Sequence, residues 1–287
     1  MDGDSASTEI TQAAGKAGRP LIYRQFLSTR LTHWIWAISL FFLLLSGLQI
    51  FNAHPALYIG DQSGFEFDNA VLRIGAERTP DEGRIGYTEI FGAKFDTTEW
   101  LGLYRDGSGI LQSRAFPGWM TIPSFYDLAT GRIVHFFFAW IFAITLAVWL
   151  VASILNGHLR RDIVPRWRDI RALPRDLADH VRLRFHHKRD YNTLQKLSYA
   201  GVLLVLMPMM VITGLCMSPG FNAAAPWLVD ILGGRQTART LHFAIMLLLV
   251  GFFVIHILMV VAAGPLNELR SIVTGWYRAD ADPTKGK

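Results

Sequence analysis

The stretch that decides the fold is Leu241 to Val261, LHFAIMLLLVGFFVIHILMVV, an apolar run that contains two histidines. Its length is typical of a helix that crosses a membrane. His242 and His256 are 14 residues apart, and 14 residues of α-helix return to within about 40° of the starting direction after a rise of roughly 21 Å. Ionisable groups are costly inside a membrane, so two of them on one helix face predict a functional site. For either histidine alone, packing by a hydrogen bond to a neighbouring helix is an equally good interpretation.

The composition of the whole chain agrees with a membrane protein. Of its 287 residues, 51% are hydrophobic and only 18% are charged, a balance that favours an integral membrane protein over a soluble enzyme. Four apolar runs are long enough to span a bilayer, at Leu31 to Phe51, Ile133 to Leu155, Leu197 to Met217 and Leu241 to Ala263. We therefore predict an all-α membrane protein, a bundle of four transmembrane helices, in which Pro208 bends the third helix without ending it.

The basic residues predict how this bundle is oriented. The N-terminal tail, residues 156–196 and the C-terminus hold 19 of the 28 lysines and arginines, whereas residues 52–131 hold six basic and eleven acidic residues. By the positive-inside rule, both termini face the cytoplasm, residues 156–196 form a basic cytoplasmic loop, and residues 52–131 lie on the periplasmic side. Residues 1–22 are predicted to form a disordered polar tail, and residues 23–287 to form one membrane domain in lipid.

Residues 52–131, called the insertion below, form the connection between the first two spans. At 80 residues the insertion is too long for an ordinary loop, and it is rich in Gly, Asp and aromatic residues. Its short apolar pieces are compatible with turns, short helices or strands. Because exposed aromatics mark interaction surfaces unless they are covered, we expect the insertion to cap the outer end of the bundle and to dock another protein on the periplasmic side. A self-packed cap without a partner is the alternative.

The cysteine count limits the chemistry of any cofactor. Cys216 is the single cysteine of the chain and lies in an apolar run, which excludes an internal disulfide, a Cys-ligated iron–sulfur cluster and covalent C-x-x-C-H haem attachment. A cofactor must therefore be held by nitrogen or oxygen ligands. The sequence has no Ser/His/Asp constellation, no phosphate-binding or dinucleotide glycine pattern and no nucleic-acid-binding module, so we expect no nucleic-acid partner.

Two further histidines match the depths of the first two. His33 lies near the cytoplasmic start of the first span and His135 near the outer start of the second. The fourth span also starts outside, so His242 lies at the depth of His135 and His256 at that of His33. Opposed imidazoles in an apolar bundle are the axial ligands that a b-type haem requires. The sequence thus predicts two haem b groups, one held by His135 and His242 and the other by His33 and His256.

Other residues near these histidines are candidates to contact the haems. Arg132 and Arg239 lie close to the outer histidines and are placed to meet haem propionates, although ordinary interfacial arginines are an equal alternative. Small residues allow close approach of either a macrocycle or another helix, and five glycines qualify, at Gly47, Gly131, Gly201, Gly214 and Gly251. His54 and His158, just beyond the first and second spans, read as interfacial residues.

These features resemble a known family, the four-helix dihaem cytochrome b membrane subunits of the prokaryotic b561-like group. That group includes the b-type cytochrome of nickel–iron hydrogenase and the gamma subunit of formate dehydrogenase. The resemblance covers residues 23–53 and 123–277 and rests on R-x-x-H-W around His33, on the early His135 and on H-x13-H in the fourth span. It implies the same two axial pairs as the depth argument. It also implies a quinone site at Asn192, in the Y-N-x-x-Q-K sequence that opens the third span, with His256 close by; a helix N-cap is the alternative role of Asn192.

The long insertion departs from the hydrogenase and formate dehydrogenase subunits. It more closely resembles the cytochrome b subunits that accompany periplasmic molybdopterin oxidoreductases. We therefore expect an electron-transfer subunit of a respiratory oxidoreductase complex, which passes electrons between the quinone pool and a periplasmic partner of molybdopterin oxidoreductase or hydrogenase type. One alternative is a stand-alone membrane oxidoreductase that acts on superoxide or ferric ion. Another is a transporter with a histidine proton relay.

Overall fold

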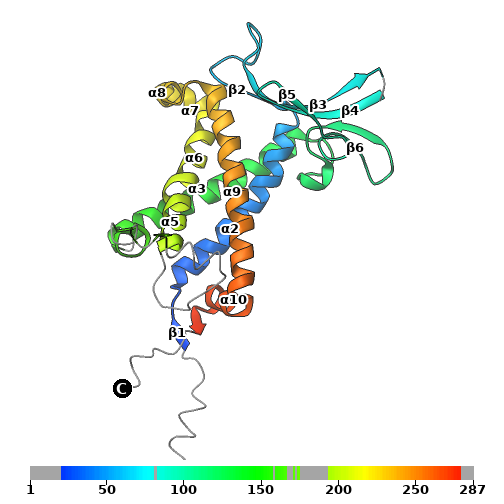
Figure 1. Cartoon of the computed structure of the whole chain (residues 1–287). Coiled ribbons are helices and arrows are strands. Elements are labelled where there is room, and N and C mark those ends of the chain that lie inside the picture. The colour runs from blue at the N-terminus through cyan, green and yellow to red at the C-terminus, as the bar shows by residue number, and fades with distance from the viewer. Residues whose placement is uncertain are drawn as a thin grey trace, which may run out of the picture. The chain divides into compact units, whose positions relative to one another are not determined.

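The computed structural model of the protein describes residues 21–80, 83–157, 159–166, 171, 173–174 and 193–278. In this part of the chain, four helical segments are long and apolar enough to cross a membrane, as predicted. Three of them are single helices (Figure 1): α2 (Leu27–Phe51), α3 (Leu128–Leu155) and α9 (Arg235–Ala263). Both α2 and α9 begin several residues before the apolar runs that predicted them. Arginine is a good helix former and its long side chain reaches out of an apolar environment, so Arg30 and Arg235 extend these helices beyond the membrane-like core.

The third span is built from three consecutive pieces. They are α5 (Thr193–Gly201), the π-helical turn η3 (Val202–Leu206) and α6 (Met207–Cys216). The two residues before Pro208, Leu206 and Met207, keep right-handed helical dihedral angles near −65° and −46°, and α6 continues through the proline to Cys216. The proline therefore does not end the span, as predicted. Two short helices follow, α7 (Pro219–Ala224) and α8 (Pro226–Ile231), and each starts with proline at its first position, where the missing N–H costs nothing.

The described residues fall into two compact units. The smaller one contains β1 (Leu21–Tyr23), α10 (Pro265–Thr274) and β8 (Trp276–Arg278), together with the π-helical turn η2 (Leu159–Ile163). Strands β1 and β8 pair antiparallel, and the Arg30 guanidinium donates to the carbonyl of Val273 at 2.6 Å. Gly275 ends α10 with φ at 89°, and a Cβ there would lie 2.5 Å from the Tyr23 ring, so only glycine fits this turn.

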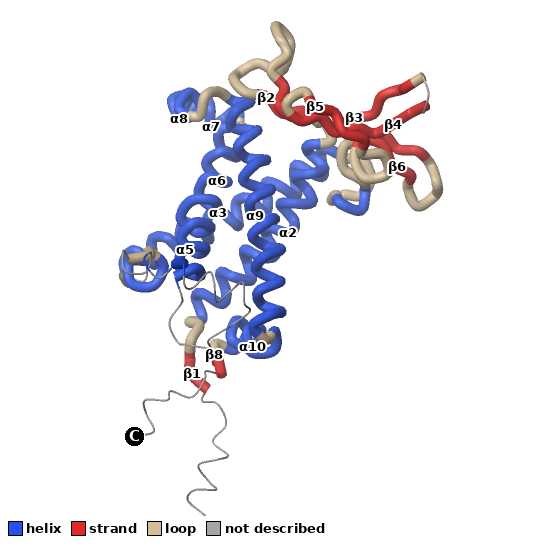
Figure 2. The backbone as a smooth tube through the Cα atoms, in the orientation of Figure 1, coloured by secondary structure: helices blue, strands red, loops and turns tan. Residues whose placement is uncertain are grey.

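The insertion is mainly β-structure, so the all-α prediction does not extend to it. Figure 2 shows its strands gathered beyond the end of α2. Four of them form an antiparallel sheet in the order β2-β3-β4-β5, and their bounds are Ala56–Tyr58, Ala70–Thr79, Gly83–Ile90 and Ala93–Asp96. Strands β6 (Gly102–Arg105) and β7 (Leu111–Arg114) form a hairpin, and the short 3-10 helix η1 (Gly118–Met120) follows.

The turn between β4 and β5 shows why this sheet was hard to predict. Ile90 pairs with Ala93, so only Phe91 and Gly92 form the loop, and both have positive φ, 48° and 82°. A two-residue hairpin with two positive φ values matches the right-handed twist of the strands, but it normally uses Asn or Asp with Gly. Because the bulky Phe91 occupies this position instead of Asn or Asp, the sequence does not predict the turn.

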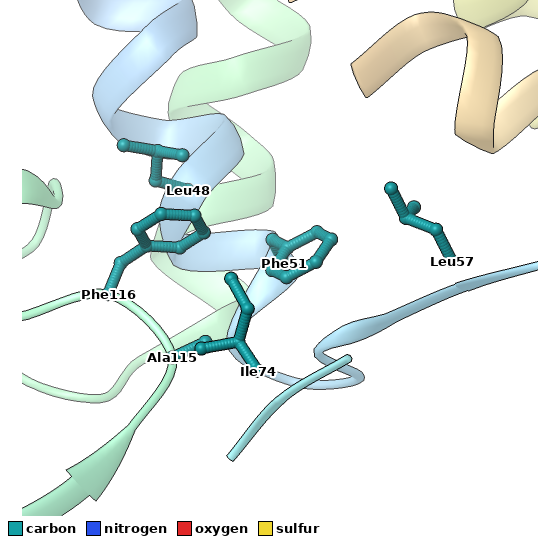
Figure 3. Close-up of a cluster of buried hydrophobic side chains, with 6 residues drawn as sticks. All are labelled: Leu48, Phe51, Leu57, Ile74, Ala115 and Phe116. Carbon is teal, nitrogen blue, oxygen red and sulfur yellow. The ribbon is translucent and has the colours of Figure 1, made fainter. Parts of the chain in front are cut away.

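A buried apolar cluster attaches the insertion to the end of α2 (Figure 3). It consists of Leu48, Phe51, Leu57, Ile74, Ala115 and Phe116. Phe243 of α9 packs against it, with its ring centre 4.9 Å from that of Phe51. A polar side chain of α2 reinforces the attachment, because the Gln49 carboxamide donates to the Phe125 carbonyl at 2.9 Å and accepts a hydrogen bond from the Arg114 guanidinium at 2.5 Å. The insertion is thereby fixed to α2 and α9, two of the helices that carry the predicted haem-ligand histidines.

Candidate haem site

The structure brings His135 of α3 and His242 of α9 together. Their ring centres are 6.5 Å apart and the ring planes are inclined by 60°. They come from helices far apart in the sequence and face each other inside the larger compact unit, which contains residues 33–155 and 201–252. The predicted outer pair of imidazoles is therefore adjacent in space, and its role as an axial ligand pair stays a prediction.

The spacing of the two rings fits one iron atom between them. A metal–imidazole bond of about 2 Å, continued by roughly 1 Å from the nitrogen to the ring centre, places two opposed ring centres ~6 to 6.5 Å apart. Among the described residues, no group of three or more His, Cys, Asp or Glu side chains gathers to hold a metal ion. A haem iron takes only two protein ligands in addition to its macrocycle, so the residues present fit a haem better than a free metal ion.

A hydroxyl from another span contacts each of these imidazoles. The Ser46 Oγ of α2 lies 3.1 Å from the Nδ1 of His135, and the Thr213 Oγ1 of α6 lies 3.0 Å from the Nδ1 of His242. The ring nitrogen on the opposite side of each imidazole, Nε2, is the one that remains to ligate iron. Each of the four spans thus contributes one side chain to this site.

A glycine beside each hydroxyl makes room for the imidazole. A Cβ on Gly47 would lie 3.3 Å from the Cε1 of His135, and a Cβ on Gly214 would lie 3.4 Å from the Cε1 of His242. These distances are at the short end of real packing contacts, so glycine lets each ring pack directly on a neighbouring helix. The two glycines accommodate the histidines themselves. Gly131 instead packs against Gln49, whose Cγ would be 2.9 Å from an added Cβ.

The two predicted propionate-binding arginines have different surroundings. Arg239 is half-buried, donates to the backbone carbonyl of His54 at 2.5 Å and lines a cavity of about 480 Å³. The other residues that line this cavity are His54, Ser63, Phe65, Met217, Arg235 and Gln236. Burial and the nearby Arg239 charge lower the pKa of His54 below its ordinary value of 6.5, so the positive charge at the cavity comes from the arginines. Arg132 is exposed beside the Phe136 ring.

The remaining predicted site residues belong to different compact units or lie outside the described residues. His33 is partly buried in α2, with its ring edge-on to Trp34 at 5.3 Å between centres. His256 is partly buried in α9. His33 belongs to the larger compact unit and His256 to the smaller one, and their pairing stays a prediction. Asn192 and His158 lie outside the described residues, as does most of the predicted cytoplasmic loop at residues 156–196.

Sequence reasoning missed Ser46 and Thr213. Both are polar residues inside apolar spans, and each directly precedes a glycine. That pattern was the available signal, but serine and threonine in membrane helices commonly bond only to their own backbone. Their partners across the bundle depend on how the helices pack.

Comparisons with known proteins identify the family of the chain. The family model described as prokaryotic cytochrome b561 matches residues 100–275, a range that includes His135, His242 and His256. A similar protein is the "Putative protein-methionine-sulfoxide reductase subunit YedZ1" of Azospira oryzae, which is 26% identical over 233 residues that cover 80% of this chain and 86% of the relative. No solved structure matches the chain. The chain belongs to the prokaryotic cytochrome b561 family and is a multi-pass membrane subunit that carries haem b and transfers electrons.

Proposed function

We propose that the chain carries two haem b groups and transfers electrons across a bacterial inner membrane, from quinol to a periplasmic oxidoreductase subunit. The observation that carries this proposal is the opposed pair of His135 and His242, 6.5 Å apart between ring centres and supported from all four spans. His33 and His256 would hold the second haem. Along α9, His242 and His256 are separated by about 21 Å, a rise that places two cofactors at different depths.

The chemistry of this site is single-electron transfer, which haem iron supplies when it is bound. The chain's own residues hold the cofactor and shape its surroundings. His135 and His242 present neutral imidazole nitrogens, and the apolar side chains of the spans exclude water. Arg239 and Arg235 place positive charge beside the outer site, where they would bind propionate carboxylates. Arg132 would contribute from the start of α3, in which case its exposed side chain turns toward the cofactor.

The periplasmic partner is proposed from two observations. The relative with 26% identity is named as a subunit of a putative protein-methionine-sulfoxide reductase, and a subunit that serves a reductase delivers electrons outward. The long insertion resembles that of cytochromes paired with molybdopterin oxidoreductases, which favours this type of partner over a hydrogenase. The insertion exposes large aromatic side chains that suit a docking surface, among them Phe65, Phe91, Phe95 and Trp100.

The distribution of lysine and arginine supports the orientation that this function requires. With both termini and residues 156–196 in the cytoplasm, the insertion and the His135–His242 pair lie on the periplasmic side. Quinol would then react near the inner haem, beside Asn192 and His256. A carboxamide at this depth can donate a hydrogen bond to a quinone carbonyl.

The experiment is purification of the full-length chain from membranes in mild detergent. We expect a dithionite-reduced α-band of b type, two haems per chain, reduction of both haems by a quinol analogue, and a co-purifying periplasmic subunit. A colourless protein would support a histidine-relay transporter. Haem without a partner, combined with turnover of superoxide or ferric ion, would support a stand-alone oxidoreductase.

The quinone link has its own test. Asn192→Ala is expected to keep both haems and to slow their reduction by the quinol analogue, because the carbonyl of the quinone loses a hydrogen-bond donor. Asn222→Ala, a matched change in α7, removes a carboxamide from the connection between the third and fourth spans and should leave the rate unchanged. Equal rates in both variants and the parent would remove Asn192 from the quinone site.

A further inference from the structure

We propose that Ser46 and Thr213 are positioning residues that fix the tautomer and orientation of the two outer haem ligands, and thereby lower the potential of the outer haem. This inference rests on the proposed ligand role of His135 and His242. It adds the residues that orient those ligands, and the third span, which supplies no histidine ligand, becomes part of the site through Thr213.

The two contacts have the same construction. Ser46 donates to the carbonyl of Phe42, four residues earlier, at 2.6 Å, and Thr213 donates to the carbonyl of Met209, also four residues earlier, at 2.7 Å. Each hydroxyl has one hydrogen, and this back-bond uses it. The oxygen then has lone pairs left for a second partner. That partner is the Nδ1 of a histidine, at 3.1 Å for Ser46 and 3.0 Å for Thr213.

The direction of the second hydrogen bond follows from this count of hydrogens. Since the hydroxyl has donated its own hydrogen, the Nδ1 of each imidazole must be the donor and must carry the proton. A neutral imidazole with hydrogen on Nδ1 has its lone pair on Nε2. The hydroxyls therefore select the tautomer that presents Nε2 toward the space between the two rings.

Burial makes these hydroxyls the partners that decide the tautomer. Ser46 and Thr213 are both 0% exposed, so water does not compete with the imidazoles for the hydroxyl oxygens. Gly47 and Gly214, next to the hydroxyls, let the rings come this close.

Outer partners of this kind influence the cofactor as well as the ligand. An imidazole that donates through Nδ1 to an oxygen gives more electron density through Nε2, which favours oxidised over reduced iron. Removing the hydroxyl is therefore expected to raise the midpoint potential of the outer haem. Loss of such an orienting partner also weakens metal-site affinity by about 10- to 100-fold.

A serine or threonine hydroxyl that bonds to its own helix backbone, but not to a histidine ligand, should not change the haem potential. Thr145 provides the matched control. In α3, Thr145 donates to the carbonyl of Ile141 at 2.7 Å and accepts from the indole N–H of Trp36 at 3.0 Å. It has the same back-bond and an aromatic donor from another helix, but its partner is not a histidine. Thr145→Val thus reproduces the loss of a hydroxyl without altering a ligand.

The test compares Ser46→Ala, Thr213→Val and Thr145→Val in the full-length holoprotein by redox titration of the α-band, electron paramagnetic resonance of the oxidised haems, and the haem-to-protein ratio. We expect the first two variants to raise the potential and shift the resonance of the same haem component, to leave the second component unchanged, and to shift further when combined. Ser46→Thr and Thr213→Ser keep a hydroxyl and should restore the parent values. Thr145→Val should shift neither component.

Unchanged potentials and resonances in both Ser46→Ala and Thr213→Val would overturn the proposal, as would equal shifts of both haems or a comparable shift in Thr145→Val. If one variant fails to accumulate, the other suffices, because each hydroxyl contacts a separate ring. Pulsed resonance of the unmutated protein in D2O is an independent measurement, since an exchangeable hydrogen on Nδ1 is required. A parent protein that lacks two haems would instead refute the proposed function.

Discussion

The membrane spans and the insertion use polar and aromatic residues in opposite ways. In the spans, the polar side chains around the histidines are buried and directed inward, as with Ser46 and Thr213 at 0% exposure. In the insertion, large aromatics are directed outward, with Phe91 81% and Trp100 73% exposed. Buried polar groups fix a single geometry, whereas exposed aromatics offer area to another surface. The difference is the one that the proposed function requires, with spans that position a cofactor and an insertion that recognises a partner.

The largest expected effect comes from removing a proposed haem ligand from the membrane spans. Under the proposed ligand assignment, His242→Ala removes one of the two axial nitrogens of the outer haem and is expected to abolish the outer component, so that the haem content falls from the proposed two per chain to one or fewer. His256→Ala should remove the inner component instead. Pyridine haemochrome assays and redox titration measure both effects. Retention of both components in His242→Ala would disprove the ligand assignment.

The His242→Ala substitution should not alter the structure of the insertion or its binding of the partner. The attachment of the insertion depends on the cluster around Phe51 and Phe116, and the proposed partner surface lies on its strands and turns. Partner binding by the His242→Ala protein is therefore expected to persist although electron transfer stops. Co-purification of the partner with the haem-depleted variant provides the measurement, and loss of the partner would show that the two regions do not act separately.

The next largest effect concerns the joint between the two regions. Phe51 is buried between Phe116 and Phe243, with ring centres at 5.5 Å and 4.9 Å, and truncating a buried phenylalanine costs about 3–5 kcal/mol. Phe51→Ala should lower the thermal midpoint of the protein and make the insertion sensitive to protease. Phe41→Ala, in the same helix but at an exposed position, is the matched control and should have little effect. Equal protease sensitivity of the two variants would contradict the assigned joint.

Much of the helical architecture, and little of the insertion, followed from the sequence. Apolar runs such as Leu241 to Ala263 identify a span by length alone. The strands of the insertion are short, and the turn at Phe91 lacks the usual asparagine or aspartate, so no local pattern identified the sheet. The aromatic residues of the insertion could be recognised in the sequence. The fold of the insertion could not, because it depends on pairing between strands such as β3 and β4.

The histidines and their supporting residues differ in the same way. His135 and His242 were predicted as a pair because an ionisable group in a membrane is conspicuous and the order of the spans sets its depth. Ser46 and Thr213 were not identified, since a hydroxyl in a span can always bond to its own helix. Only the packing of α2 on α3 and of α6 on α9 reveals which histidine each hydroxyl faces.

A moderate effect is expected at the partner surface of the insertion. An exposed tryptophan that becomes buried in an interface typically contributes about 2 kcal/mol, which corresponds to roughly 30-fold in affinity. Trp100→Ala should weaken binding of the periplasmic partner by about this factor and leave the haem content at the parent value. Trp227→Ala, an exposed tryptophan of α8 outside the insertion, is the control. Unchanged binding in Trp100→Ala, and likewise in Phe91→Ala, would place the partner elsewhere.

The smallest effect is expected from the exposed ion pairs of the sheet. The Arg73 guanidinium bonds to Asp68 at 2.5 Å and also faces Glu89, its cross-strand neighbour on β4, at 3.4 Å. The hydrogen bond from Arg73 lowers the pKa of Asp68 below its ordinary value of 3.8. Because the folded value is the lower one, the stabilisation by this pair is fully present above about pH 4 and is lost as the pH falls through the folded pKa.

Asp68→Asn should therefore reduce the thermal midpoint only slightly at neutral pH, since exposed ion pairs contribute little in water. The difference from the parent should shrink in about 1 M salt, where the Debye length is roughly 3 Å. Glu66→Gln removes an exposed carboxylate of the same loop outside this pair and is the control for net charge. A loss in Asp68→Asn as large as that in Phe51→Ala would mean that the insertion is held by surface charge, and the contrast between a buried joint and an adaptable outer surface would fail.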